Sequence, residues 1–337
     1  MARRTGPTPR PGYTMIELLV VILIISILAA LLTAAVTRGL GSGKKAQAAS
    51  DISNLDMAMT NFHKDHKFYP PCYITEMSPA DSQQHVRRFV IPSNIAQPEV
   101  LLLKKMFTRW NPATDASGNF TSPLEGAGTA LDSNQVMVYF LGGPRALFGP
   151  SMSTATYGWQ KTEPRAAVSG ANTRIDPYYD FPEVRLAPEG GTHDGRFRDP
   201  WGTPYAYFTS SGNNYDPRFI FPWLTAETRT FAWSATAQQV APATVYTPPP
   251  AGTFPDFTHL VHPFRSSNRW VNEGKVQIIS AGPDLGFGAG SPITQASPLV
   301  VRDWVAGQAE YMSGAGNVGN DDLANFNAGA ALGETGR

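Results

Sequence analysis

Glu17 is the one carboxylate in a stretch of sequence that is otherwise almost wholly apolar from residue 15 to residue 32. An ionised side chain at membrane depth costs roughly 2.5 kcal/mol or more unless an opposite charge pairs with it. As a helix, residues 13–36 would be about 36 Å long, which is enough to cross a bilayer. The chemistry that these residues predict is therefore an ion pair between a membrane-embedded carboxylate and a cationic partner.

The residues before this segment form a short basic leader that ends in a glycine. Gly12 closes the leader, residues 1–12, an aromatic residue, Tyr13, follows it, and Glu17 is the fifth residue after Gly12. These features resemble the processing site of type IV prepilins and of type II secretion pseudopilins. The resemblance implies that a prepilin peptidase cleaves between Gly12 and Tyr13 and methylates the new amino group, and that Glu17 then pairs with the Tyr13 amine of a neighbouring subunit. The basic residues of the leader are Arg3, Arg4 and Arg10.

Two other interpretations of the N-terminal segment remain open. One is a signal anchor in which Glu17 only complements the positive end of the helix, an effect worth about 0.3–1 kcal/mol. The other is a secretory signal peptide that is cut at small residues such as 29–30. Positive charge before the helix predicts a cytoplasmic N-terminus, although Arg38, Lys44 and Lys45 follow the helix. The resemblance favours a single-pass protein of the bacterial inner membrane with a periplasmic head.

The composition predicts a folded head rich in turns. The formal net charge is zero, with 27 basic and 27 acidic residues, so nothing indicates a nucleic-acid partner. Charged residues make up only 16% of the chain, and its 31 glycines and 29 prolines favour short strands and long loops over helices. Cys72 is the only cysteine, which excludes an intrachain disulfide. Packing or a metal must therefore hold the head together.

The apolar segment continues into an amphipathic helix. Beyond the glycine cluster at residues 39–43, which should weaken the helix locally, apolar residues recur at spacings of three, four and three. This period of about 3.6 residues predicts a helix that lies on a core. Prolines at 70 and 71 should end it, because proline cannot continue a helix, so we expect one long helix over residues 13–70. The apolar positions are Ile52, Leu55, Met59 and Phe62.

Several segments of residues 71–337 have readable patterns. Residues 136–141 form an apolar run that we interpret as a buried strand, ended by glycine and proline. Residues 199–208 indicate a turn that leads into a strand, and residues 275–284 a strand that leads into a glycine-rich loop. We interpret residues 72–195 and 211–270 as long insertions. The ordered blocks 51–70, 199–208, 275–284 and 320–326 resemble those of the type II secretion major pseudopilin.

In major pseudopilins the C-terminal loop binds calcium, and the resemblance extends this role to three aspartates. Calcium takes six to eight oxygen ligands, typically carboxylates and backbone carbonyls. Asp284, Asp321 and Asp322 match the acidic ligands of that family, within an acidic loop at residues 280–327. The long segment 285–320 between them departs from the family pattern.

Taken together, the N-terminal motif and these blocks resemble a pseudopilin, an assembly subunit and not an enzyme. The fold class that we expect is α+β: a long N-terminal helix packed on a small antiparallel sheet with large loop insertions. The partners that the resemblance implies are prepilin peptidase, other copies of the subunit in a homopolymer, the inner-membrane secretion platform and membrane lipid. A type IV pilin or minor pilin with an adhesive head is the first alternative. A membrane-anchored hydrolase or carbohydrate-binding protein is the second.

Overall fold

The chain divides into two compact units, residues Met1–Ala46 and Gln47–Arg337. The part of the chain that the structure, a computed structural model, describes consists of residues 15–72, 74–76, 85–87, 89–152, 155–168, 174–210, 215, 231–234, 239–242, 261, 263–266, 269–287, 299–300 and 322–327. Only the backbone is described for residues 31–40, 74–76, 85–87, 168, 231–234, 239–242 and 299–300.

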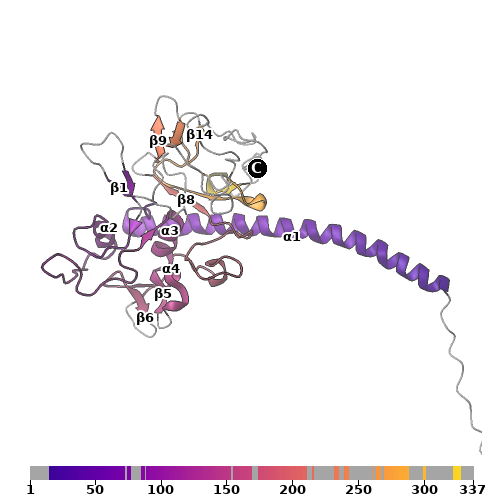
Figure 1. Cartoon of the computed structure of the whole chain (residues 1–337), viewed down its shortest axis with the longest axis horizontal. Coiled ribbons are helices and arrows are strands. Elements are labelled where there is room, and N and C mark those ends of the chain that lie inside the picture. The colour runs from indigo at the N-terminus through magenta and orange to yellow at the C-terminus, as the bar shows by residue number, and fades with distance from the viewer. Residues whose placement is uncertain are drawn as a thin grey trace, which may run out of the picture. The chain divides into compact units, whose positions relative to one another are not determined.

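The structure is of the α+β class, which confirms the expected fold class (Figure 1). The described α-helices are α1 (Met15–His66), α2 (Glu99–Met106), α3 (Ser133–Gly142) and α4 (Pro144–Phe148). The strands are β1 (Ile74–Glu76), β2 (His85–Arg87), β3 (Phe89–Val90), β4 (Ala130–Leu131), β5 (Ala155–Gln160), β6 (Ala166–Val168), β7 (Arg174–Ile175), β8 (Ala206–Thr209), β9 (Phe231–Ser234), β10 (Gln239–Pro242), β11 (Arg265–Ser266), β12 (Arg269–Trp270), β13 (Val276–Ser280), β14 (Leu299–Val300) and β15 (Leu323–Ala324).

Helix α1 confirms the long N-terminal helix, and its backbone is helical through the glycine cluster at residues 39–43. The helix ends at His66, a few residues before the prolines, because Lys67 adopts a left-handed conformation with a φ of 63°. The apolar stripe is confirmed as the face toward the core: Ile52, Leu55, Met59 and Phe62 are each at most 1% exposed. Complete burial of such side chains contributes about 1.5–3 kcal/mol each.

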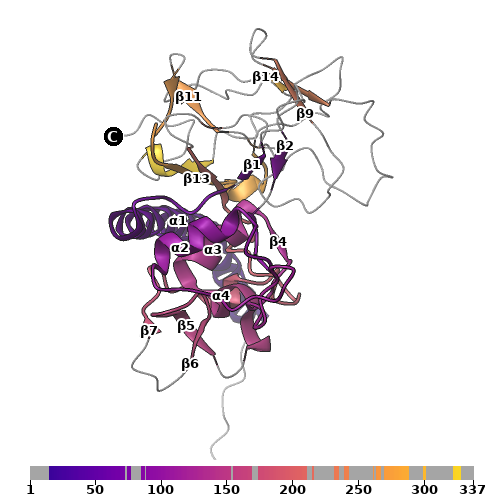
Figure 2. The same ribbon diagram turned by 90° about the vertical axis from the view of Figure 1, so that its left-hand side faces the viewer.

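Within the second unit, α1 lies between two layers (Figure 2). On one side Phe62 packs edge-on against Phe140 of α3, with ring centroids 5.9 Å apart. On the other side the Asn325 side chain, next to β15, donates to the Asp56 carboxylate at 2.7 Å. The helix is therefore the central element of the head, and side chains on both of its flanks fix it.

The antiparallel sheet β15-β13-β8 covers one flank of α1. Ile278 of β13 pairs with Tyr207 of β8, and Ser280 pairs with Leu323 of β15. The strands expected after residue 199 and after residue 275 are thereby confirmed as neighbours in one sheet. Every residue of β13 is buried, because the Gln277 amide exchanges hydrogen bonds with the Phe264 backbone and that segment covers the sheet.

The expected strand at residues 136–141 is wrong, because these residues lie in helix α3. The Asp132 carboxylate accepts a hydrogen bond from the Gln135 backbone N–H, and the Gln135 side chain accepts one from the Asp132 backbone N–H. This capping box starts a helix at Ser133. A short apolar run does not distinguish a strand from a helix that is buried on all sides, so the cap determines the element here.

The insertion at residues 72–195 is more regular than expected. It contains α2, α3 and α4 and the antiparallel sheet β6-β5-β7. Gly143 separates α3 from α4 with a φ of 84°, and a Cβ there would lie 2.2 Å from the Gly158 carbonyl oxygen of β5. Only glycine therefore allows this close approach of helix and strand. Most of the second insertion, residues 211–270, lies outside the described residues.

Candidate functional site

The residues of the expected cleavage site, Gly12 and Tyr13, lie outside the described part of the chain. Glu17 is described: it lies in the first turn of α1, and its side chain is exposed. A carboxylate at this position faces the positive end of the helix dipole, which contributes about 0.3–1 kcal/mol. That contribution is smaller than the cost of placing the charge in a membrane.

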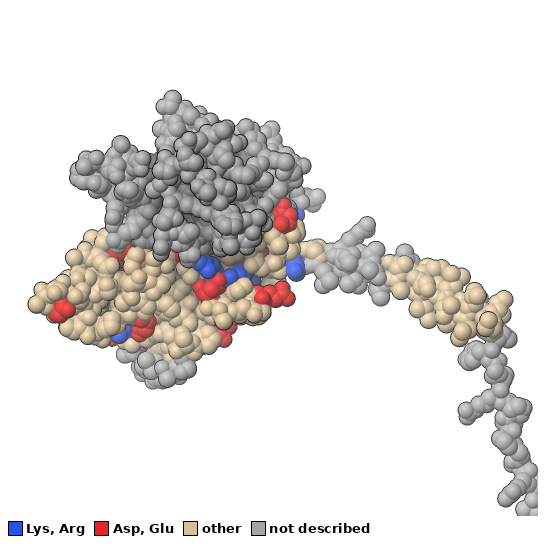
Figure 3. Space-filling model, in the orientation of Figure 1, with Lys and Arg blue, Asp and Glu red and all other residues tan. Residues whose placement is uncertain are grey.

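The first turns of α1 expose apolar side chains on all faces of the helix. The large apolar residues from Met15 to Leu28 have exposed fractions between 45% for Val20 and 88% for Met15. In Figure 3 the surface of this stretch is almost entirely free of Lys, Arg, Asp and Glu. A helix that is apolar on every face is normally buried in a large core or in lipid. These side chains therefore require a covering other than water.

Among the described residues, none of the helices is both long enough and apolar enough to span a membrane. The expected span, residues 13–36, includes residues 13–14 and the side chains of residues 31–36, which lie outside the described part of the chain. The span stays a prediction.

The turn that precedes β8 is built around a buried carboxylate. Asp199 is 2% exposed and accepts hydrogen bonds from the backbone N–H groups of Trp201 and Thr203, each at 3.0 Å. The Ser280 hydroxyl of β13 donates to its other oxygen at 2.7 Å. Burial raises the pKa of Asp199, although these hydrogen bonds act in the opposite direction. Two of the sequence blocks, 199–208 and 275–284, are thus joined by one side chain.

A second buried carboxylate ties α1 to the rest of the head. Asp51 accepts a hydrogen bond from the Arg185 guanidinium at 2.7 Å and another from the Tyr205 hydroxyl at 3.1 Å. The Arg185 side chain also donates to the Arg198 carbonyl and lies 4.4 Å from the centroid of the Phe197 ring. The side chains of Asp51 and Arg185 are only 12% and 14% exposed. Since water scarcely reaches the pair, each charge depends on the other.

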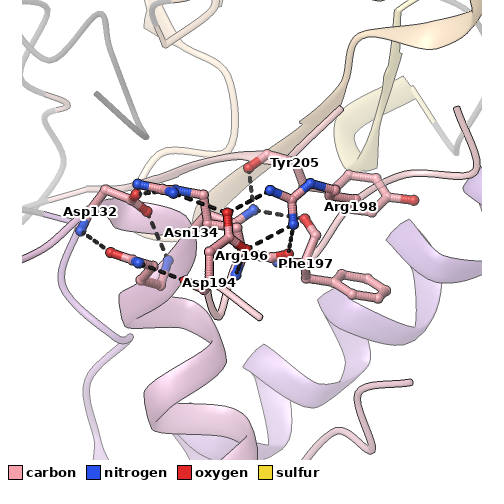
Figure 4. Close-up of polar contacts among 8 residues, drawn as sticks. Asp132, Asn134, Asp194, Arg196, Phe197, Arg198 and Tyr205 are labelled. Atoms are coloured by element: carbon pink, nitrogen blue, oxygen red, sulfur yellow. Dashed lines mark hydrogen bonds and ion pairs between the residues drawn. The ribbon is translucent and has the colours of Figure 1, made fainter. Parts of the chain in front are cut away.

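Figure 4 shows a polar cluster that joins the segment before β8 to helix α3. Arg196 donates to the α3 cap residue Asp132 at 2.7 Å, and Asp194 receives hydrogen bonds from both Arg196 and Arg198. Burial acts to raise the pKa of Asp194, but the hydrogen bonds and charge of Arg198, with those of Arg196, outweigh it and lower the pKa.

The Asn134 side-chain amide also belongs to this cluster, where it forms hydrogen bonds with backbone groups as a neighbouring strand would. Its oxygen accepts from the Phe197 backbone N–H at 2.7 Å, and its nitrogen donates to the Phe197 and Tyr205 carbonyls. The amide satisfies backbone groups that a neighbouring strand would otherwise bind. Together these contacts make a rigid support for the segment that leads into β8.

The contacts that these buried polar side chains make were not predicted from the sequence. Asp51 and Arg185 are 134 residues apart, and no local pattern relates them. The spacing of Asp132 and Gln135, three residues apart before an apolar run, was the signal that could have identified the helix cap.

The register of the sheet brings two of the expected calcium ligands to the same end of β13. Asp322 immediately precedes Leu323, which pairs with Ser280, and Asp284 ends the short 3-10 helix Gly282–Asp284 that follows β13. The third residue, Asp321, lies outside the described residues. The described residues include no group of three His, Cys, Asp or Glu side chains placed to hold a metal. The calcium set stays a prediction.

Desolvation by neighbouring atoms raises the pKa of Asp284, although its carboxylate accepts a hydrogen bond from the Gly286 backbone N–H at 2.9 Å. The side chain is exposed, and the turn after β13 places it on the surface of the head. Carboxylates and the backbone carbonyls of a turn are the donors that calcium prefers, so these residue types fit that ion.

Comparison with known protein families gives a match at the N-terminus. Residues 9–33 match the family model of the prokaryotic N-terminal methylation motif, which covers Gly12, Tyr13 and Glu17. No curated protein and no solved structure matches the chain. The chain carries the N-terminal motif of prepilin-type proteins, and this supports a type IV pilin-like protein that is anchored in the membrane at its N-terminus, processed by prepilin peptidase and assembled with other pilin subunits.

Proposed function

We propose that this protein is a pseudopilin, a subunit that polymerises into a periplasmic pseudopilus for type II protein secretion. The observation that carries the proposal is the methylation motif followed by a helix whose apolar side chains are exposed on every face. The motif indicates a structural subunit, and the buried polar residues Asp51, Asp199 and Asn134 hold the head together.

The mechanism of assembly follows from Glu17. In the proposed pathway the prepilin peptidase removes residues 1–12 and leaves a methylated amine on Tyr13. The helix over residues 13–36 anchors the subunit in the inner membrane, with the head in the periplasm. In the filament, apolar helices pack against one another, so the medium around Glu17 has a low dielectric constant. The Tyr13 amine of the next subunit is then the partner that relieves an otherwise uncompensated charge.

The order of the sequence blocks favours the secretion type over other pilin-like proteins. The blocks at residues 199–208 and 275–284, which resemble the major pseudopilin, supply the adjacent strands β8 and β13. The block at residues 320–326 supplies β15 on the other edge of β13.

Within this proposal, Asp284, Asp321 and Asp322 hold a calcium ion at the end of β13. Calcium would supply a link between the last strand and the C-terminal tail, which no disulfide can provide in a chain with one cysteine. The carboxylates provide the negative charge and the turn provides carbonyl oxygens.

The experiment that tests the proposed function replaces Glu17 with valine. Glu17→Val should insert into the membrane at least as well as the wild type, because an intramembrane charge is removed. Crosslinking between subunits and secretion of exported proteins should both fall, because the Tyr13 amine loses its partner. Leu18→Val is the matched control in the same turn of the helix and should leave both unchanged.

Two results would redirect the proposal. Normal crosslinking and secretion in Glu17→Val would refute the assembly role of this residue. Normal secretion combined with loss of surface filaments would favour a type IV pilin over a pseudopilin.

A further inference from the structure

We propose that the heads of neighbouring subunits contact each other head to tail, with the end of α1 and the adjoining helix α2 of one copy docked on residues 180–189 of the next. This inference rests on the proposed function, because it requires that the protein polymerises. It deepens that function by naming two surfaces of the head through which one copy recognises another.

The two most exposed large apolar side chains among the described residues of the second unit belong to these two surfaces. Leu101 of α2 is 67% exposed, and Val184 is 83% exposed. Leu101 lies one turn before Lys105 on the same face of α2. Single exposed apolar residues are common on protein surfaces, so the charges around them must indicate the partner.

The surface at the end of α1 is positively charged. Lys64 and Lys67 are exposed there, and the Lys67 ammonium donates to the Lys64 carbonyl at 2.7 Å. Helix α2 lies beside this end of α1 (Figure 1), and the exposed Lys105 ammonium is 5.6 Å from the centroid of the Phe68 ring. None of the three lysines forms an ion pair with another described residue. Asp65 is the neighbouring carboxylate, and the three lysines exceed its charge.

Residues 180–189 carry the opposite charge. Asp180 and Glu189 are exposed, and neither forms an ion pair with another described residue. Glu183 is also exposed, but Arg145 already compensates its charge at 2.8 Å. Two uncompensated carboxylates thus lie on either side of Val184 in the sequence. An apolar side chain among charges of one sign, on each of two surfaces of opposite sign, suits an interface with an apolar centre and a polar rim.

The positions of the two surfaces favour contact between copies over contact within one copy. The Arg185 guanidinium holds the acidic segment at Asp51. Between Asp51 and Lys64 the helix α1 rises about 20 Å, at about 1.5 Å per residue. A contact between two different surfaces is heterologous, and it repeats as an open filament unless the rotation between copies closes a ring. The distribution of charge therefore fits a polymer that grows in one direction.

The test is disulfide crosslinking of the full-length protein in the membrane of its native host. Cys72, the only cysteine, is buried and can stay in place. On mild oxidation Leu101→Cys/Val184→Cys should form a ladder of dimers, trimers and larger multimers, because every copy offers both surfaces. Co-expressed Leu101→Cys and Val184→Cys chains should stop at the dimer, and each single variant alone should stay monomeric. Leu285→Cys/Val184→Cys is the control: Leu285 is 44% exposed but lies outside both surfaces, so no ladder should form.

Charge reversal provides a second measurement. In the Leu101→Cys/Val184→Cys chain, Lys64→Glu/Lys105→Glu should abolish the ladder, because carboxylates would then face carboxylates. Addition of Asp180→Lys/Glu189→Lys to the same chain should restore the ladder, which a misfolded head could not do. High salt should weaken the ladder of the original two-cysteine chain, because it screens exposed charges.

Three results would overturn the inference: no ladder from Leu101→Cys/Val184→Cys, dimers from Leu101→Cys alone, or no recovery in the chain with all four charges reversed. In each case, Glu17-dependent crosslinking of the wild type by an amine-reactive reagent would show that the subunits still assemble and that the proposed function stands. Absence of that crosslinking in the wild type would refute the proposed function and the inference together.

Discussion

Replacement of Asp51 by alanine should destabilise the head strongly, because it leaves the Arg185 guanidinium buried without a counter-charge. The Asp51 carboxylate accepts two hydrogen bonds, from Arg185 at 2.7 Å and from Tyr205 at 3.1 Å. Removal of one partner of a buried ion pair costs about 3–5 kcal/mol. The side chains retain exposed fractions of 12% and 14%, so some water can reach the remaining charge. We therefore expect a loss near the lower end, about 3 kcal/mol in the free energy of unfolding.

Urea unfolding of residues 39–337 measures this loss, and Asp176→Ala is its control. Asp176 also forms an ion pair with an arginine, Arg174, but its side chain is 81% exposed. An exposed pair contributes about 1 kcal/mol at most, so the control should stay close to the wild type. If Asp51→Ala and Asp176→Ala lose the same free energy of unfolding, burial does not make the Asp51–Arg185 pair contribute more to stability than an exposed pair.

A double-mutant cycle separates the pair from the rest of the cluster. Arg185→Met removes the guanidinium and keeps much of the side-chain volume. Since Asp51→Ala combined with Arg185→Met leaves no unpaired charge, the double variant should lose less stability than the sum of the single variants, by at least about 1 kcal/mol. Strict additivity would show that the two side chains act independently.

Three further predictions concern processing, metal binding and pH. Gly12→Leu should accumulate as unmethylated precursor, because the peptidase must approach the backbone closely at glycine; normal processing, seen by mass spectrometry, would contradict this. Calcium at a hundredfold excess over its Kd should stabilise the fragment of residues 39–337 by about 2.7 kcal/mol in thermal unfolding, and Asp321→Ala/Asp322→Ala should lose most of that gain; an equal shift in both proteins would place the ion elsewhere. Asp194→Asn should be less stable than the wild type at neutral pH, and because the pKa of Asp194 is lowered in the folded protein, the difference should shrink as the pH falls below about 3.9; a difference independent of pH would exclude the charge of Asp194 as its cause.

The elements that local patterns specify were predictable from the sequence. The apolar spacing from Ile52 to Phe62 repeats over several turns, so its period identifies a helix and its buried face. The turn residues at 199–202 and the apolar residues of β13 likewise predicted strands where the structure has them. These signals are local because turns and periodic faces depend on residues that are near one another in the sequence.

Features that depend on distant contacts were not predictable in the same way. Residues 136–141 are apolar on every face, so they lack the periodicity that distinguishes helix from strand, and the cap at Asp132 decides the outcome. The pairing of Asp51 with Arg185 becomes visible only when the fold brings them together. For the candidate site, the sequence identified the motif at residues 9–33, whereas the polar support of the head required the structure.

Mass spectrometry of the N-terminal peptide from the natively produced protein tests the central claim most directly. If the chain is a prepilin-type subunit, the peptide begins at Tyr13 and has a methylated amine. A peptide that begins at Met1, or one produced by a cut near Ala30, would contradict the account, because Glu17 would then have no Tyr13 amine to bind in a neighbouring subunit.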